Sequence, residues 1–305
     1  MNFVLGSDSD VAELASHITF FESSLVNTVW PTEMLSWAKG ERKVGVDQIQ
    51  CVINWFNRFS LWIPSLLLDC KIESHYLLII SKAIELGEEL LQLRNYQGVF
   101  EIVGGLTHTI TERLYSLSKL NENLKKKLFF LKQHTSAEKN FKKLREGLEG
   151  RANNSHGCVL PCVPYIGLYL ADLTFIYDAT DDVIDGLMNL TKMRKISLVI
   201  ERMQSHQTPF LANETTQTRS KKCVYGSLLS SPSPPPFQRL LELIPTEKEL
   251  YKLWKDKRKR EVGGIGEGER AKEGEKDKSG DGGGEISVLA LGGNRRRLWG
   301  EREGV

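Results

Sequence analysis

Few residues in this sequence are placed for covalent or metal chemistry. His156, Cys158 and Cys162 cluster in one segment, but three candidate ligands at this spacing, with no second Cys/His pair at a usual distance, do not match a zinc finger or ribbon. The glycine-rich stretch at 263–268 follows a basic helix and no strand, so it lacks the context of a phosphate-binding loop. Neither a GxSxG elbow nor a credible Ser/His/Asp set occurs. We therefore expect no metal and no cofactor, and these residues by themselves name no function.

A run of positive charge from Lys252 to Arg260 allows two interpretations. It is basic enough for a nuclear-import signal or for weak peripheral contact with an acidic membrane. Alternatively, it is a solvated helix end whose cations suit the helix dipole. The whole chain has 41 Lys and Arg against 39 Asp and Glu, and this near balance gives no electrostatic reason to expect nucleic acid as a partner.

The cysteines and the apolar segments indicate the compartment. Five irregularly spaced cysteines fit a reducing environment better than a disulfide-stapled secreted fold. No basic stretch followed by a long apolar run begins the chain, and no segment has about 20 apolar residues without charges. We expect a cytoplasmic protein without a signal peptide or membrane span, which residues 252–260 could bring to a membrane.

The elements that would position functional residues are helices. From about residue 10 to residue 135 the apolar residues recur at three- and four-residue spacings. Asp8 or Asp10 can cap a first helix, which the Trp30–Pro31 pair ends. A break between two helices is expected near Gly104–Gly105. No segment shows sustained strand alternation, so the expected fold is all-α, a single orthogonal multi-helix domain.

A protruding helical hairpin is predicted beyond residue 160. The first helix should end near Tyr177, and an acidic turn should follow it. The second helix should begin around Asp182 or Asp185 and run to about His206.

The composition changes after the hairpin. Residues 211–236 have the Ser/Pro content of an insertion or linker. A closing helix with Thr246 as N-cap and Glu249 at the capping-box position follows. From 261 to 305 the chain has few apolar residues, so we expect a disordered low-complexity tail and a folded domain over residues 8–260.

Five blocks of sequence follow one another in an order typical of a known family. They are ELASHITFFESSLVNTVWPTEML, NWFNRFSLWI, LRNYQGVFEIVGGL, SAEKNFKKLREGL and PCVPYIGLYLADLTFI. Together they resemble the catalytic domain of Ras-family guanine-nucleotide exchange factors, the RasGEF domain. The resemblance covers roughly residues 8–260 and implies a Ras-like small GTPase of the Ras, Rap or Ral class as partner, bound preferentially without nucleotide.

The resemblance also implies a mechanism without covalent chemistry. In the family, an apolar pocket holds the second switch of the GTPase while a helical hairpin displaces the first switch from the nucleotide. Thr174 and Asp178, at i and i+4 on one helix face, would form the working face of that hairpin. Thr174 would occupy the magnesium position without supplying a ligating charge, and Asp178 would place a carboxylate near the phosphate site. The alternative for Asp178 is a solvated acid that ends the helix.

By the same resemblance, five residues would bind the GTPase. Ile53, Phe100 and Tyr165 would line the apolar pocket, although plain core packing is the alternative for each. Asn57 would contact the second switch or brace the hairpin. Asn54 stands where the family commonly has Arg, so a cation that could engage an acidic switch residue is missing.

Two further residues would support the hairpin. Asn95 is expected to be structural. Asp172 lies in an otherwise apolar helix turn, where an unpaired carboxylate would be costly, so we expect it to hold the hairpin's angle through a hydrogen bond. The basic residues Lys192, Arg194 and Lys195 are interpreted as solvated surface.

Departures from the family pattern favour a second hypothesis, an exchange-inactive GTPase-binding or scaffold module that keeps the fold. Besides Asn54, Phe141 replaces a usual Tyr, which removes a hydrogen bond worth about 1 kcal/mol. Asp178 is one methylene shorter than the common Glu. Family members often have an N-terminal helical domain that braces the hairpin, and the ten residues before the first helix cannot supply one, so low basal activity is expected.

Overall fold

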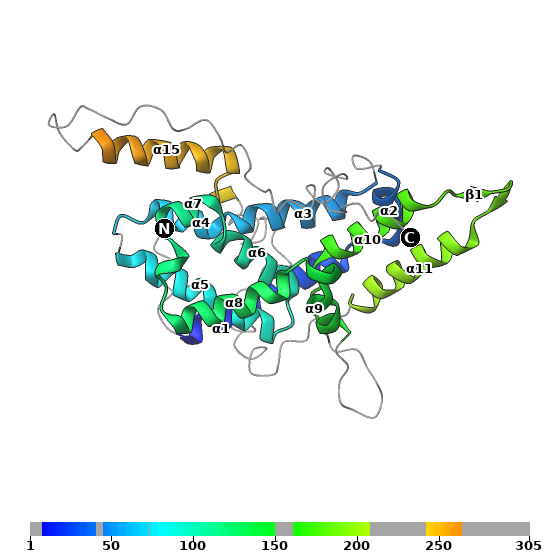
Figure 1. The fold of residues 1–305 in the computed structure, drawn as a ribbon, viewed down its shortest axis with the longest axis horizontal. Coiled ribbons are helices and arrows are strands. Elements are labelled where there is room, and N and C mark those ends of the chain that lie inside the picture. Colours follow the sequence, from blue (N-terminus) through cyan, green and yellow to red (C-terminus); the bar gives the residue numbers. More distant parts are fainter. Residues whose placement is uncertain (1–7, 41–44, 73, 150–160, 208–241, 264–305) are drawn as a thin grey trace, which may run out of the picture.

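The computed structural model describes residues 8–40, 45–72, 74–149, 161–207 and 242–263. This part of the chain is almost entirely helical, so the all-α prediction is confirmed (Figure 1). Its α-helices are α1 (Asp8–Asn27), α2 (Pro31–Ala38), α3 (Asp47–Ser60), α4 (Trp62–Asp69), α5 (Ser74–Gln92), α6 (Tyr96–Leu106), α7 (Thr109–Leu114), α8 (Glu122–Thr135), α9 (Glu138–Leu148), α10 (Ile166–Ala179), α11 (Leu190–Ser205) and α15 (Glu247–Gly263). Two short strands, β1 (Val183–Ile184) and β2 (Leu187–Met188), pair antiparallel, and a 3₁₀ helix, η1, spans Leu117–Lys119. The predicted insertion at 211–236 and the tail beyond 263 lie outside the described residues.

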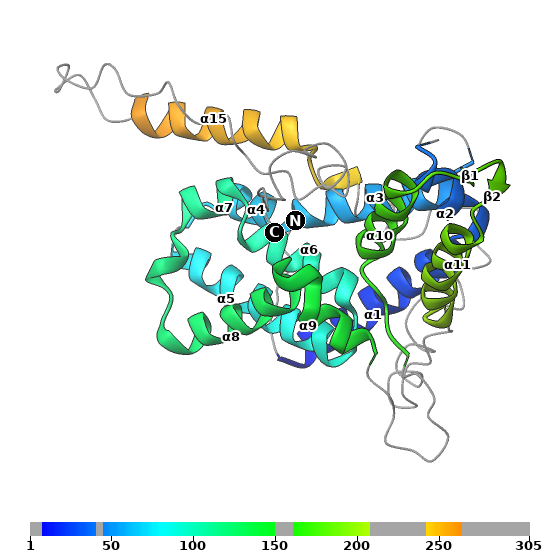
Figure 2. The same cartoon turned by 45° about the vertical axis from the view of Figure 1, so that its right-hand side comes forward.

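Helix α3 runs along the body between α4 and α2 and buries one broad apolar face (Figure 2). Ile53 and Phe56 belong to an apolar cluster shared with α2, α6, α10 and α11. Trp55 and Phe59 belong to a second cluster shared with α1, α4, α5, α6 and α8. All four side chains are at most 2% exposed. One apolar face of α3 is wide enough to contact both clusters, so α3 joins the two halves of the core.

The predicted break between two helices is present but comes after Gly104–Gly105, since both glycines lie inside α6 and α7 begins at Thr109. A Cβ atom at Gly105 would lie 2.7 Å from the backbone oxygen of Ser60 at the end of α3. The glycine therefore permits a close approach of two helices, which offsets its usual cost in a helix interior. The break comes at His108, whose Nδ1 accepts a hydrogen bond from the Ile110 amide and caps α7.

A buried polar cluster connects α1, α3 and the start of α6, which belong to three of the sequence blocks. Trp55 Nε1 donates to Glu22 Oε1 at 2.8 Å, and Asn95 Nδ2 donates to Glu22 Oε2 at 2.6 Å and to Thr19 Oγ1 at 3.1 Å. Asn95 Oδ1 also accepts from the Gly98 amide and caps α6. Buried polar side chains need such partners, so this cluster fixes how the three helices meet.

The same cluster contains a second fully buried acid, Glu101. Burial raises the pKa of Glu101 well above its usual range, and the negative charge of nearby Glu22 raises it further. Burial also raises the pKa of Glu22, although hydrogen bonds from Glu101, Trp55 and Asn95 oppose this. Glu101 is therefore the more readily protonated of the two acids, and Gln97 Nε2 donates to Glu101 Oε1 at 3.2 Å.

We expect Glu101→Gln to flatten the pH dependence of stability. A folded pKa that is raised gives stability that is fully present below the unfolded pKa, near 4.5, and is lost as the pH rises through the folded value. Glutamine cannot ionise but keeps a donor for Glu22. Urea unfolding of both proteins from acid to mildly alkaline pH tests this. The variant should gain on the wild type as the pH rises, and parallel curves would contradict the assignment of the proton.

Candidate functional site

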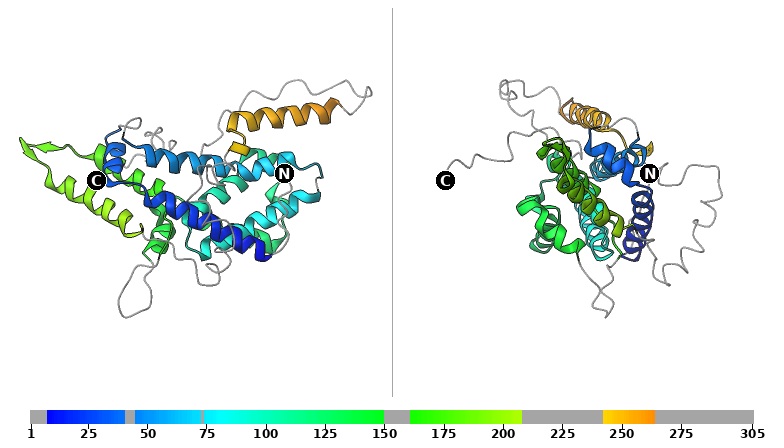
Figure 3. Two further views of the ribbon diagram at one scale, coloured as in Figure 1. Left: turned by 180° about the vertical axis from the view of Figure 1, so that it is seen from behind. Right: turned by 90° about the vertical axis from the view of Figure 1, so that its right-hand side faces the viewer.

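Helices α10 and α11 form a hairpin that projects from the helical body, with β1 and β2 at its tip (Figures 1 and 3). The base of α10 is buried from Ile166 to Leu170, whereas Phe175 and Asp178 further along are exposed. The packed base anchors the hairpin in the apolar cluster, and its outer half is left accessible to a partner.

The predicted start of the second hairpin helix is wrong. Helix α11 begins at Leu190, with Asn189 as its N-cap, and Asp182 and Asp185 lie in the connection. Asp185 and Gly186 have φ angles of 52° and 76°, as a two-residue turn between antiparallel strands requires. The sequence could have predicted this turn, because an Asp-Gly pair between the apolar pairs Val-Ile and Leu-Met is typical of a β-hairpin.

Thr174 and Asp178 both lie on the projecting part of α10. Thr174 is half-buried, and its hydroxyl donates to the Leu170 backbone oxygen at 2.8 Å, a local bond typical of helical threonines. Asp178 is exposed one turn further out. Neither side chain is packed into the core, so a partner can approach this face.

Asp172 anchors α10 to α9 through the arginine of another sequence block. Arg145 donates two hydrogen bonds to the Asp172 carboxylate, each 2.8 Å long, and one to the Asn140 backbone oxygen at 2.9 Å. The bond to Asp172 raises the pKa of Arg145. Asn140 lies in a left-handed stretch with Lys139 and Phe141, a strained conformation for such residues. The bidentate pair thus connects the hairpin to a strained turn.

The three residues expected in an apolar pocket lie close together but are buried. Ile53, Phe100 and Tyr165 are 1%, 6% and 2% exposed and belong to one cluster. The rings of Phe100 and Tyr165 are stacked, with centroids 3.9 Å apart, and burial raises the pKa of Tyr165. A partner side chain could reach these residues only after a neighbouring side chain moves.

The two asparagines of α3 are more accessible. Asn54 is exposed, and its Oδ1 accepts a hydrogen bond from Gln50 Nε2 at 3.0 Å. Asn57 is half-buried, one helical turn beyond Ile53. These residues give α3 a polar surface next to the buried apolar set.

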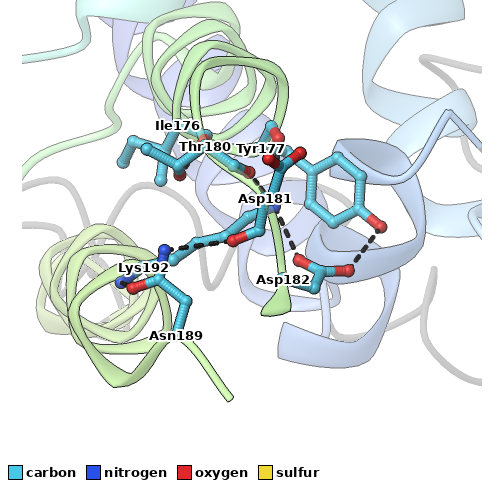
Figure 4. Close-up of polar contacts among 7 residues, drawn as sticks. All are labelled: Ile176, Tyr177, Thr180, Asp181, Asp182, Asn189 and Lys192. Atoms are coloured by element: carbon cyan, nitrogen blue, oxygen red, sulfur yellow. Dashed lines mark hydrogen bonds and ion pairs between the residues drawn. The ribbon is translucent and has the colours of Figure 1, made fainter. Parts of the chain in front are cut away.

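The interpretation of Lys192 as solvated surface is wrong. Its side chain is only 2% exposed and lies between the two hairpin helices, whereas Arg194 and Lys195 are exposed as predicted (Figure 4). The Lys192 ammonium donates to the backbone oxygens of Tyr177 and Thr180. A lysine can be buried when all its donors are satisfied, a condition that its neighbours in sequence do not reveal.

Cys162 and His206 form a pair without the properties of a nucleophile. The Cys162 Sγ lies 3.2 Å from His206 Nδ1, and both residues are buried. Burial raises the pKa of Cys162 to about 11 and lowers that of His206 to about 4. At neutral pH both are uncharged, and a thiol reacts poorly. Among the described residues no group of three or more His, Cys, Asp or Glu could hold a metal ion; the other two candidate ligands, His156 and Cys158, lie outside them.

The closing helix α15 begins with the predicted capping box, in which the Thr246 amide donates to Glu249 and the Glu249 amide donates to the Thr246 hydroxyl. Part of its basic run is used in packing. Lys257 Nζ donates to Tyr76 Oη at 2.8 Å, and Arg258 lies over the Trp254 ring. No helix in the described ranges is both long and apolar enough to span a membrane.

The sequence matches the model of one protein family and several known proteins. The family model for the RasGEF domain matches residues 13–194, more than half of the chain. Ras guanine nucleotide exchange factor W of Dictyostelium discoideum is 29% identical over 68% of this chain and 18% of its own length. Ras guanine nucleotide exchange factor K of the same organism is 31% identical over 66% of this chain and 13% of its own length.

A vertebrate protein is similar to this chain to about the same degree. Ras-specific guanine nucleotide-releasing factor 2 of Danio rerio is 31% identical over 65% of this chain and 16% of its own length. The chain thus matches less than a fifth of each of these three relatives. The match to the family model includes α3, α6 and the whole of α10. On this evidence the chain belongs to the RasGEF domain family.

Proposed function

We propose that this chain promotes GDP release from a Ras-like small GTPase by inserting its helical hairpin beside the nucleotide. The observation that carries the proposal is the placement of Asp178, exposed one turn beyond Thr174 on a helix that projects from a packed base. Such a helix can enter a partner's site without unfolding the body. We assign the role to a domain of residues 8–260, with 211–236 as an insertion.

The physical basis is differential binding. GDP with magnesium is held tightly, so release is fast only if the exchange factor binds the empty GTPase better than the loaded one. Thr174 in the magnesium position offers no ligating charge. The Asp178 carboxylate near the phosphate site repels the nucleotide, by about 1 kcal/mol at 4 Å in water and more when solvent is excluded.

The partner and its surroundings follow from the same proposal. The relatives are named for Ras, so we propose a GTPase of the Ras, Rap or Ral class. Asn57, Asn54 and the buried apolar set would meet its second switch. Activity would be cytoplasmic, and the basic run at 252–260 would make weak contact with an acidic membrane; its exposed cations include Lys252, Lys255, Arg258 and Lys259.

An exchange-inactive GTPase-binding module is the second candidate. Two observations favour it: Asn54 offers no cation on the exposed side of α3, and the three pocket residues are closed off in the chain alone. Such a module would bind a GTPase without preferring its empty form.

Capture of a GTPase in three nucleotide states separates the two candidates. The full chain is immobilised and offered the same GTPase in its nucleotide-free, GDP-loaded and GTP-loaded forms. An exchange factor should retain the nucleotide-free form most strongly. Equal retention of all three forms would overturn the proposed function in favour of the second candidate.

A further inference from the structure

Lys192 is a buried cation bound to the end of the helix that carries Asp178. Its ammonium lies 2.6 Å from the Thr180 backbone oxygen, 3.0 Å from that of Tyr177 and 2.6 Å from Asp182 Oδ1 (Figure 4). An ammonium has three donors, so all are used. The same group lies 4.0 Å from the centre of the Tyr177 ring.

These bonds act where α10 is weakest. The last carbonyl groups of a helix have no partner within the helix, and that end carries the negative pole of the helix dipole. Lys192 binds the Tyr177 carbonyl of the final turn and the carbonyl of the C-cap residue Thr180, and its positive charge suits this negative pole. Asp178 lies between Tyr177 and Thr180, so the bound carbonyls bracket it.

A second set of bonds connects the two helices at the same place. The backbone nitrogen of Asn189 donates to the Asp182 backbone oxygen at 2.8 Å, and the side-chain Nδ2 of Asn189 donates to the Asp181 backbone oxygen at 3.0 Å. Asn189 Oδ1 accepts from the Lys192 amide and caps α11. The N-cap of α11 is thereby bound to the two residues that follow Thr180, and Lys192, three residues after this N-cap, lies against the end of α10.

We propose that Lys192 is a positioning residue for exchange, which holds the last turn of α10 so that the Asp178 carboxylate keeps its place on the hairpin. This role rests on the proposed function. Without the ammonium, two carbonyls and the Asp182 carboxylate lose a shared partner, and the final turn of α10 frays into solvent. The bonds described for Lys192 are to residues 177–182, beyond the base of α10 at Ile166–Leu170, so capture of the GTPase by that base and by α3 should persist.

The test compares three variants of the full chain. Lys192→Met keeps the length of the side chain without its charge, and Lys192→Arg keeps the charge. Arg194→Met is the matched control, because it removes an exposed cation of the same helix. The rate of fluorescent GDP release is measured against the concentration of exchange factor, which gives a maximal rate and a half-saturating concentration.

Lys192→Met should lower the maximal rate by about fivefold, because small misplacements of a reacting group are costly, and should leave half-saturation within about twofold. Lys192→Arg should recover part of the rate, and Arg194→Met should match the wild type. Backbone amide exchange at residues 178–182 should be faster only in Lys192→Met. That readout needs no GTPase and reports the final turn directly.

Three other results would each overturn a proposal. A Lys192→Met protein with the wild-type maximal rate overturns the positioning role and leaves the proposed function standing. A variant that changes half-saturation as much as the maximal rate, with unchanged amide exchange at 178–182, also overturns the role. A wild-type chain that releases no GDP overturns the proposed function and the role with it.

Discussion

Tyr165→Ala is expected to lower the free energy of unfolding by about 3–5 kcal/mol, the range found when a large buried aromatic is truncated. Tyr165 is 2% exposed, is stacked on Phe100 with the ring planes 7° apart, and contacts Phe56 with ring centroids 5.6 Å apart. Its loss would leave a cavity where α3, α6 and α10 meet. Typical domains have about 5–15 kcal/mol of stability in total, so urea unfolding should show a large shift.

Tyr165→Phe is the matched control, since it keeps the ring stack and removes only the hydroxyl. It should cost much less than Tyr165→Ala. If Tyr165 also binds the second switch, Tyr165→Ala should weaken GTPase capture at a temperature where it is still folded. If folded Tyr165→Ala captures the empty GTPase normally, Tyr165 stabilises the core and does not bind the GTPase.

Asp178→Ala should slow the maximal rate of GDP release by about tenfold, which corresponds to about 1.4 kcal/mol. The carboxylate is exposed on the projecting helix, so its removal costs the fold little. Its repulsion of the phosphates exists only when the hairpin is inserted. Release should therefore slow more than capture weakens, and the comparison needs both a release rate and an affinity for the empty GTPase.

Asp181→Ala controls for the charge change. Asp181 is also exposed near the end of the hairpin, and its bond to Asn189 uses the backbone oxygen, which the substitution keeps. It should leave release nearly unchanged. Equal small effects from Asp178→Ala and Asp181→Ala would mean that the hairpin acts through its general negative charge, and the specific role of Asp178 would be wrong.

Much of the fold follows from patterns within single helices. The apolar spacing from residue 10 to 135 and the Trp30–Pro31 stop are local signals; the first predicts helices, and the second predicts the end of α1, which lies at Asn27. The β-turn at Asp185–Gly186 was equally local, because the Asp-Gly pair suits two positive φ angles. Helical periodicity on both sides of it obscured that signal.

What escaped prediction depends on contacts between distant segments. Gly105 reads as a helix breaker until α3 is seen to pass beside it. The Asp172 carboxylate needs a hydrogen-bond partner, but the sequence of its own helix does not indicate that this partner is Arg145, 27 residues away. Lys192 resembles its exposed neighbours Arg194 and Lys195, and only the return of α11 against the end of α10 buries it. Burial of a polar side chain is a property of packing, not of local sequence.

The release of fluorescent GDP from a panel of Ras, Rap and Ral GTPases tests the central claim most directly. Micromolar wild-type chain should accelerate release from at least one of them, and Asp178→Ala should reduce that acceleration while Asp181→Ala preserves it. Release at the intrinsic rate from every GTPase of the panel, by a chain shown to be folded, would contradict the claim that this hairpin opens a nucleotide site.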